Sequence, residues 1–282
     1  MVGHHYVEQL AGSGVTAKIT VLGAEPRPAY DRVHLSEYFA GRKPEELALT
    51  TREHYKSIGV DAYFGDAVAT IDREAKTVTT EGGRSFRYDK LVLATGSYPF
   101  VPPLPGADLP DCLVYRTIDD LGMIQARSKK AKVGVVVGGG LLGLEAANAL
   151  QNLGLKTHVV EFAPGLMGVQ LDNGGSAMLR RKIEALDVQV HTSKATQTIE
   201  ETDGKDTRLV MNFADGETLA TDVIVFSAGI RPSDQLARDC GLEVGPRGGI
   251  TIDYHCRTSD SDIFAIGECA LYGGMIFCLV AP

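Results

Sequence analysis

The sequence predicts an α/β fold of two related domains, and two observations support this prediction. The first is a glycine-rich turn, Gly138 to Gly143, which lies between a β-branched apolar stretch and a stretch rich in alanine and leucine. The second is an internal repeat, because Gly83 to Pro99 aligns without gaps with Gly216 to Pro232 at an offset of 133 positions (216 − 83). A chain that uses one supersecondary plan twice is expected to form two copies of one kind of domain.

Around the glycine-rich turn, the sequence predicts a strand, then a phosphate-binding turn, then a helix. Val133 to Val137 is β-branched apart from one glycine and reads as a buried parallel strand. The next residues match the pattern G-x-G-x-x-G, in which Gly138 permits the tight turn and Gly140 lets backbone N–H groups approach a pyrophosphate. Gly143 allows the helix to pack closely on the strand, and the N-terminus of that helix favours an anion.

A second strand is expected at "KTHVVEFAP", ending in Glu161. Glu161 lies 23 positions after Gly138 (161 − 138), about where a carboxylate accepts hydrogen bonds from an adenosine ribose. A glycine-rich turn without a ligand is the alternative, but the strand before it, the helix after it and the acid together favour a Rossmann-like dinucleotide site.

The repeat predicts a related domain earlier in the chain. Each copy follows a hairpin-like stretch, with turns near "TEGG" and "TDGKD". Five residue pairs are identical in the two copies: Gly83 and Gly216, Asp89 and Asp222, Val92 and Val225, Gly96 and Gly229, and Pro99 and Pro232.

The opening residues fit the same plan. When Gly3 is aligned with Gly143, a helix, a strand (Lys18 to Leu22) and an acid, Glu25, follow in the same order as in the later domain. Gly3 is then the third glycine of a first fingerprint. We therefore expect the chain to begin inside its own phosphate-binding loop, without the strand that would precede it.

Composition and charge restrict the class of protein. With 282 residues, 44% of them hydrophobic and 23% charged, the chain has the composition of a globular protein of more than one domain. A net charge of −8 argues against nucleic acid as a partner. The longest uncharged apolar stretch, Val133 to Leu144, is far shorter than the roughly 20 residues of a membrane span. No signal peptide is visible, and five scattered cysteines without a C-x-x-C pair fit a reducing, cytoplasmic setting.

Two further segments resemble the pyridine nucleotide-disulfide oxidoreductase superfamily, whose first fingerprint binds FAD and whose second binds NAD(P)H. "LVLATGSYP" resembles the family's ATG segment and carries Ala94, Thr95 and Gly96. "SDIFAIGECA" resembles the late segment that holds the flavin's ribityl chain, here Gly267 and Glu268, where the usual acid is Asp. The resemblance implies two Rossmann-like domains, each with a β-hairpin or meander insertion. The NAD domain (residues 114–249) is then inserted into an FAD domain formed by residues 1–113 and 250–282.

A narrower resemblance covers nearly the whole chain. "AEPRPAYDRVHLSEYF", "VYRTIDDL", "GGGLLGLEAANAL" and "GPRGGI" are similar to the N-terminal reductase part of the large subunits of cytoplasmic NADH-dependent nitrite reductases. The resemblance implies electron transfer from NADH through FAD to iron–sulfur and sirohaem modules, in later parts of the same protein or in a small subunit. It also implies reduction of nitrite to ammonia in nitrate assimilation.

The resemblance also assigns roles to single residues. Glu25 is implied to accept from the FAD adenosine ribose, Arg32 to lie near the FAD phosphates, and Glu145 to face the nicotinamide. A surface ion pair for Arg32 and an acid in the first helical turn for Glu145 are the alternatives. Because bound cofactors carry such reactions, no general acid or base is expected. The seven histidines form no H-x-x-x-H pattern, so no metal site is expected.

Two other functions stay open on the sequence. One is a stand-alone NADH-dependent rubredoxin or ferredoxin reductase, which would continue into a short α+β cap instead of cysteine-rich modules. The other is a nucleotide-binding sensor that keeps the fold without turnover. An internal redox disulfide is excluded, because the chain has no C-x-x-C motif.

Overall fold

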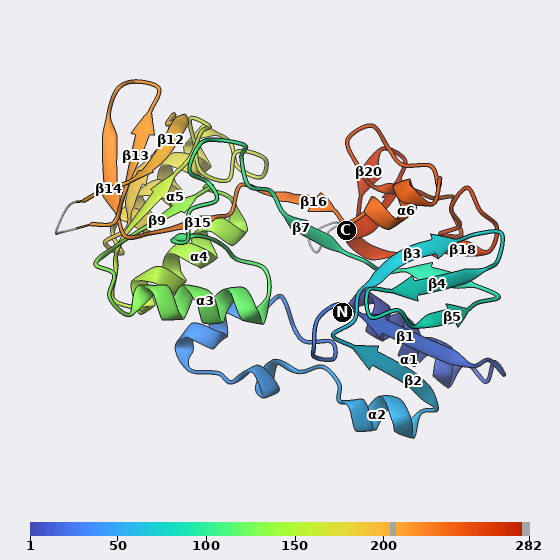
Figure 1. Ribbon diagram of the computed structural model, residues 1–282. Coiled ribbons are helices and arrows are strands. Elements are labelled where there is room, and N and C mark those ends of the chain that lie inside the picture. Colours follow the sequence, from blue (N-terminus) through green and yellow to red (C-terminus); the bar gives the residue numbers. More distant parts are fainter. Residues whose placement is uncertain (204–206, 278–282) are drawn as a thin grey trace. The chain divides into compact units, whose positions relative to one another are not determined.

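Two compact units, each with its own hydrophobic core, make up the computed structural model, which describes residues 1–203 and 207–277 (Figure 1). The first unit comprises Met1–Asp31, Glu45–Tyr98 and Arg231–Pro282. The second comprises Arg32–Pro44 and Pro99–Ile230. The expected α/β fold is confirmed.

The second unit is built on a five-stranded parallel sheet with the order β11-β10-β9-β15-β8. Its strands are β8 (Cys112–Val114), β9 (Val133–Val137), β10 (Lys156–Val160), β11 (Gln189–His191) and β15 (Val223–Phe226). Its helices are η1 (Leu35–Ala40), α3 (Ile118–Ser128), α4 (Leu141–Asn152) and α5 (Asn173–Glu184). The central strand β9 reads as continuously apolar because its middle residues, whose side chains alternate between the two faces of the sheet, are all buried.

A three-stranded antiparallel meander is attached to this sheet. It consists of β12 (Thr196–Glu201), β13 (Leu209–Phe213) and β14 (Thr218–Thr221). The hairpin expected near "TDGKD" is formed by β12 and β13, although residues 204–206 of its turn lie outside the described residues.

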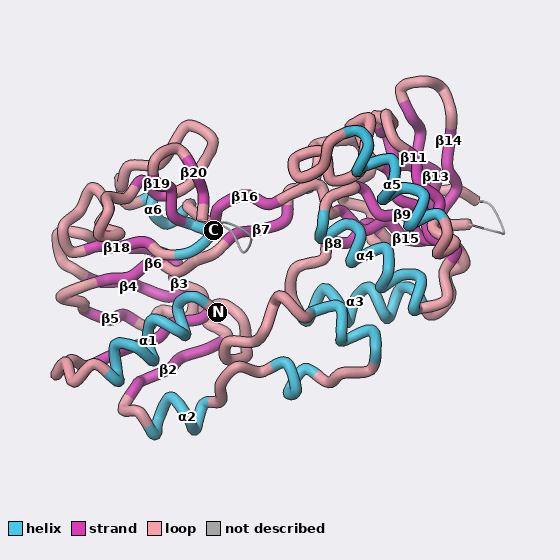
Figure 2. The backbone as a smooth tube through the Cα atoms, turned by 180° about the vertical axis from the view of Figure 1, so that it is seen from behind, coloured by secondary structure: helices cyan, strands magenta, loops and turns pink. Residues whose placement is uncertain are grey.

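The first unit carries a matching meander, seen together with its neighbouring strands in Figure 2. It consists of β3 (Val68–Asp72), β4 (Thr77–Thr80) and β5 (Ser85–Arg87), and its β4–β5 turn is the "TEGG" segment. The parallel strands of this unit form two separate pairs. These are β1 (Ile19–Gly23) with β2 (Val60–Phe64), and β6 (Leu91–Leu93) with β18 (Ile263–Ala265).

Helices and a small sheet complete the first unit. The helices are α1 (Val2–Gly12), η2 (Pro44–Leu47), α2 (Arg52–Ser57), α6 (Gln235–Asp239) and η3 (Gly267–Cys269). The sheet has the order β17-β19-β20, with β17 (Ile250–Thr251), β19 (Ala270–Tyr272) and β20 (Met275–Ile276). Two further short strands, β7 (Ser97–Pro99) and β16 (Ile230–Pro232), pair with each other.

The unit boundaries differ from the expected ones at residues 113/114 and 249/250. Residues 99–113 belong to the second unit, because β8 is an edge strand of its sheet and pairs with β15. Residues 231–249 belong to the first unit, where α6 packs on β3 and the Asp234 carboxylate accepts a hydrogen bond from the Gly249 N–H group. The segment Arg32–Pro44 also groups with the second unit. None of the described helices has both the length and the apolar character needed to cross a membrane.

Candidate functional site

The glycine-rich turn of the second unit has the geometry that its pattern predicts. Gly138 has φ +121°, and a Cβ there would lie 2.3 Å from the Ser227 carbonyl oxygen. A Cβ on Gly143 would lie 1.9 Å from the Gly138 carbonyl oxygen, so helix α4 can approach the strand only because this residue is glycine. By contrast, a Cβ on Gly140 would meet nothing within 4 Å. The turn is therefore tight where chain meets chain and open where a phosphate would approach.

Glu161, at the end of β10, is held against this turn. Its Oε2 accepts a hydrogen bond from the Gly139 N–H at 2.5 Å, and its Oε1 accepts one from the Ala163 N–H at 2.7 Å. Its backbone donates to the His191 carbonyl at 2.8 Å and accepts from the Lys194 N–H at 3.0 Å. The carboxylate thus has a fixed position beside the fingerprint, as a ribose acceptor requires.

Glu145 is the fifth residue of α4 and is half-buried. The alternative role as an acid of the first helical turn is therefore wrong, since the first turn of α4 contains no acid. Burial raises the pKa of the Glu145 carboxyl, and the nearby His34 opposes this shift. Partial burial of an acid without a fully compensating cation is typical of binding sites.

Segment Arg32–Pro44 is attached to the same unit. The Arg32 Nη1 donates to the Arg116 carbonyl at 3.0 Å, and the rings of Phe39 and Tyr115 stack with centroids 6.3 Å apart. Thr117, in the segment "VYRTIDDL", caps α3 in a capping box with Asp120. The structure thus places Arg32 in the second unit, while a role near FAD phosphates remains a prediction.

In the first unit, several predicted residues come together after strands β6 and β18. A Cβ on Gly3 would lie 3.0 Å from the Ala94 Cβ, and Gly267, with φ +74°, lies against Val2. The Glu268 Oε2 accepts a hydrogen bond from the Ser97 hydroxyl at 2.7 Å. These contacts bring the start of α1, the ATG segment and the late acidic segment to one place.

The ATG segment itself is fixed by the chain that returns from the second unit. The Thr95 hydroxyl donates to the Ser233 carbonyl at 2.6 Å, and the Ser233 N–H donates to the Gly96 carbonyl at 2.9 Å. Gly96 has φ +69°, and its repeat partner Gly229 has φ +105°, so both glycines occupy the left-handed region.

Glu25 follows β1, and its Oε2 accepts a hydrogen bond from the Tyr30 hydroxyl at 2.7 Å. Like Glu268, it lies just beyond the carboxyl end of a parallel strand, where ligands of such sheets bind. Neither the Tyr30 contact nor the Ser97 contact was foreseen, because a hydroxyl partner five or 171 positions away leaves no periodic signal.

Two histidines approach each other without any sequence signal. The Nδ1 of His158 lies 3.0 Å from the Nε2 of His191, with the rings nearly parallel. Burial, followed by the charge of His191, lowers the pKa of His158 to about 4. Across the described residues, no three His, Cys, Asp or Glu side chains are grouped so that they could hold a metal ion.

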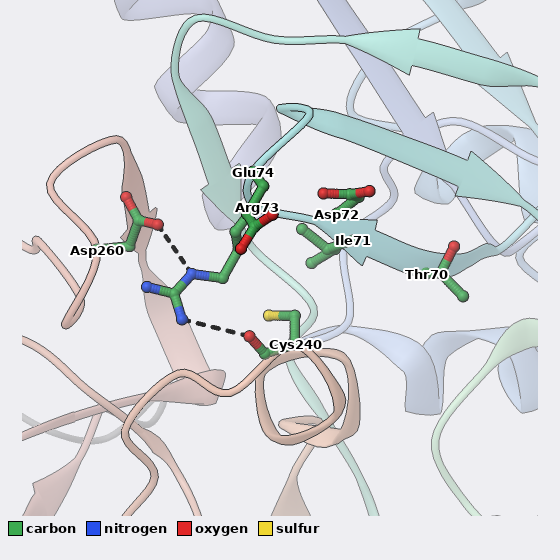
Figure 3. A pocket seen from close by; sticks show the side chains of 7 residues that line it. All are labelled: Thr70, Ile71, Asp72, Arg73, Glu74, Cys240 and Asp260. Carbon is green, nitrogen blue, oxygen red and sulfur yellow. Dashed lines mark hydrogen bonds and ion pairs between the residues drawn. The ribbon is translucent and has the colours of Figure 1, made fainter.

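A cavity elsewhere in the first unit is lined by none of the predicted site residues (Figure 3). It has a volume of about 780 Å³, and the Arg73 side chain crosses it. The Arg73 Nε donates to Asp260 at 2.9 Å and its Nη1 donates to the Cys240 carbonyl at 3.3 Å. Because Arg73 joins the meander to the returning chain in this way, the cavity is the gap around a structural clamp.

Comparison with known proteins identifies the family of the chain. Residues 3–281 match the family described as pyridine nucleotide-disulphide oxidoreductase. Over its whole length the chain is 59% identical to a nitrite reductase [NAD(P)H] large subunit from Klebsiella oxytoca and 54% identical to the nitrite reductase (NADH) large subunit from Escherichia coli. It covers 29% and 33% of these proteins, respectively, and so spans about a third of their length.

A solved structure shows the same fold. A ferredoxin reductase from Rhodopseudomonas palustris is 29% identical and superposes with a TM-score of 0.86, covering 95% of this chain and 66% of that one.

Proposed function

Because the chain belongs to the pyridine nucleotide-disulphide oxidoreductase family, we propose that it is the NADH:FAD reductase module of a nitrite reductase. The observation that supports this most is the identity of 59% and 54% to two nitrite reductase large subunits over all of this chain. In the proposed pathway, electrons pass from NADH through FAD to iron–sulfur and sirohaem centres in other modules of the full-length protein or in a small subunit. The place of action would be the cytoplasm.

The residues of the second unit fit an NAD-type dinucleotide. A Cβ at Gly140 would meet nothing within 4 Å, and a pyrophosphate in this open place would bind backbone N–H groups at the start of α4. Glu161 would accept from the adenosine ribose hydroxyls. Its charge would repel a 2′-phosphate, and the following residues, Phe162 to Pro164, provide no cation to receive one. We therefore propose a preference for NADH over NADPH.

The residues of the first unit fit a flavin dinucleotide. Glu25 would bind the adenosine ribose, and Gly267 and Glu268 would hold the ribityl chain. The hydrogen bond from Ser97 keeps the Glu268 carboxylate in place, although Glu is one carbon longer than the family's usual Asp. When bound, FAD would supply the chemistry that accepts a hydride and releases single electrons. The protein's own part is to position and orient, which explains why no general acid or base is needed.

The proposal is tested by rapid mixing of the FAD-loaded protein with NADH without oxygen. We expect bleaching of the flavin absorbance by NADH, slower bleaching by NADPH, and electron delivery to an artificial acceptor such as ferricyanide. In the Glu161→Ala variant, the rates of flavin reduction by NADH and NADPH should differ less, because the charge that repels the 2′-phosphate of NADPH is gone. Equal reduction by both nucleotides in the unmodified protein would contradict the proposed role of Glu161, and no reduction by either would contradict the function.

Nitrite itself should not be reduced by this chain. A six-electron reduction needs a centre that binds nitrite and stores electrons, and the described residues offer no cluster of metal ligands. Ammonia formed from nitrite by the purified chain would contradict this division of labour.

A stand-alone ferredoxin reductase is the second candidate, favoured by the TM-score of 0.86 to such an enzyme. The two candidates differ in the acceptor. If the chain is a stand-alone ferredoxin reductase, the FAD-loaded chain reduces a soluble ferredoxin or rubredoxin at a rate comparable with the rate at which NADH reduces its flavin.

A further inference from the structure

Phe162, directly after Glu161, exposes a large apolar ring in the second unit. Its side chain is 78% exposed, whereas Phe213 and Phe226 of the same unit are buried in the core. A single exposed apolar residue needs no special explanation. Phe162, however, directly follows the candidate ribose acceptor, Glu161.

The backbone on both sides of Phe162 is firmly held. Glu161 donates to the His191 carbonyl at 2.8 Å, and the Ala163 N–H donates to the Glu161 Oε1 at 2.7 Å. The Ala163 carbonyl accepts from the Ser193 N–H at 3.0 Å. The ring is therefore exposed on a rigid support and is not part of a loose loop, which lowers the entropy that a ligand must remove on binding.

We propose that Phe162 is the stacking surface for the adenine ring of the dinucleotide bound by the second unit. This inference rests on the proposed function. In adenosine the base is bonded to the ribose carbon beside the one that carries the 2′-hydroxyl. A ribose that donates to Glu161 therefore carries its base within reach of a neighbouring side chain. Adenine is neutral and flat, so the face of an aromatic ring is a suitable partner for it. Such stacking does not require hydrogen bonds between the protein and the base.

The loop after Phe162 is also tied to the fingerprint, which fixes the distance between the stacking surface and the phosphate site. The Met167 N–H donates to the Gly139 carbonyl at 2.9 Å, and the buried Leu166 lies against Gly139, where a Cβ would come within 2.6 Å of it. Adenine, ribose and pyrophosphate would thus bind to three parts of one rigid assembly: Phe162, Glu161 and the glycine turn.

The test compares ligands that contain or lack the adenosine half. Binding of ADP-ribose, NAD⁺ and nicotinamide mononucleotide to the full chain is measured by calorimetry for the unmodified protein, Phe162→Ala and Phe162→Tyr. Leu186→Ala is the matched control, because Leu186 is an apolar residue of the same unit that is 58% exposed and lies outside the site. Since Phe162 packs against little, its replacement should leave the melting temperature unchanged.

We expect Phe162→Ala to raise the Kd for ADP-ribose and NAD⁺ by about 5-fold or more, as loss of one base–aromatic stack does. The Kd for nicotinamide mononucleotide should not change, Phe162→Tyr should bind normally, and so should Leu186→Ala. If the unmodified protein binds ADP-ribose and Phe162→Ala binds it within 2-fold as tightly, the stacking role is refuted while the proposed function stands. If the unmodified protein binds neither ADP-ribose nor NAD⁺, both are refuted.

Discussion

Asp222 offers the sharpest test of how the fold supports the nucleotide site, because the internal repeat supplies its own control. Asp222 is 3% exposed, and its Oδ2 accepts hydrogen bonds from the N–H groups of Lys132 and Val133 at 2.7 and 2.9 Å. Lys132 directly precedes strand β9 and Val133 is its first residue, and this strand leads into the glycine turn. The equivalent residue of the repeat, Asp89, is exposed. We expect Asp222→Ala to destabilise the protein and Asp89→Ala to have little effect.

The size of the effect follows from the two hydrogen bonds. Each bond to a charged acceptor contributes about 1.5–3 kcal/mol, and removing the Asp222 carboxylate takes this acceptor from two N–H donors at the start of the central strand β9. At the lower end of that range Asp222→Ala costs about 3 kcal/mol. For a protein of this size, that corresponds to a fall of roughly 6–12 °C in melting temperature. Asp222→Asn keeps an oxygen acceptor and should lose less.

Thermal unfolding followed by circular dichroism measures these differences, and NAD⁺ binding at a temperature where all variants are folded measures their effect on the turn. Asp222→Ala should also bind NAD⁺ more weakly, since the start of β9 is no longer fixed. The reasoning is refuted if Asp222→Ala and Asp89→Ala melt within about 1 °C of each other, because the two-bond anchor would then contribute nothing.

Three further predictions use single residues of the second unit. Burial raises the pKa of Glu145, so the folded protein favours the neutral carboxyl and loses stability as the pH rises above the pKa of this group in the unfolded chain. Glu145→Gln should therefore melt at a higher temperature than the unmodified protein at pH 7.5 but not at pH 3.5. A lower melting temperature of the variant at pH 7.5 would contradict this. The pKa of His158 is lowered to about 4, so the neutral imidazole stabilises the fold fully above about pH 6.5, and this stabilisation, at most about 3 kcal/mol, is lost as the pH falls to 4. In His158→Gln, the free energy of unfolding measured with urea should therefore depend less on pH between 4 and 6.5. An unchanged pH dependence would contradict this. Gly140→Ala should fold normally and bind NAD⁺ at least 10-fold more weakly, whereas Gly143→Ala should fail to fold stably, since only the second Cβ meets the backbone; circular dichroism and calorimetry separate the two outcomes, and equal stability would refute the distinction.

Much of the second unit could be predicted from sequence because its signals are local. The strand–turn–helix around Gly138 follows from apolar character and glycine spacing, and the structure has these elements at β9 and α4. The α/β class followed from the glycine-rich turn and the repeat, and the hairpin-like stretches followed from the repeat; the family resemblance implied the hairpin or meander insertions, and a meander is present in each unit. The boundaries near residues 98 and 230 could not be placed, because they depend on which sheet the short strand β8 joins, and three residues carry little pattern.

Features that depend on long-range contacts were also beyond the sequence. The His158 and His191 pair forms because neighbouring parallel strands bring positions 33 apart into contact. Arg32 illustrates the same limit, since its guanidinium bonds to the carbonyl of Arg116, 84 positions away. A family motif can indicate a role for a residue, but the partner that fixes its side chain depends on the fold.

The two units also differ in a way that bears on FAD binding. In the second unit, β9 lies between β10 and β15. In the first unit, β1 corresponds to β10 and β6 to β15, but among the described residues these two strands lie in separate two-stranded sheets. The strand that leads into a phosphate turn normally occupies that central place. Among the described residues of the first unit, no strand lies between β1 and β6 in one sheet, although Gly3, near the start of α1, lies close to Ala94, just after β6.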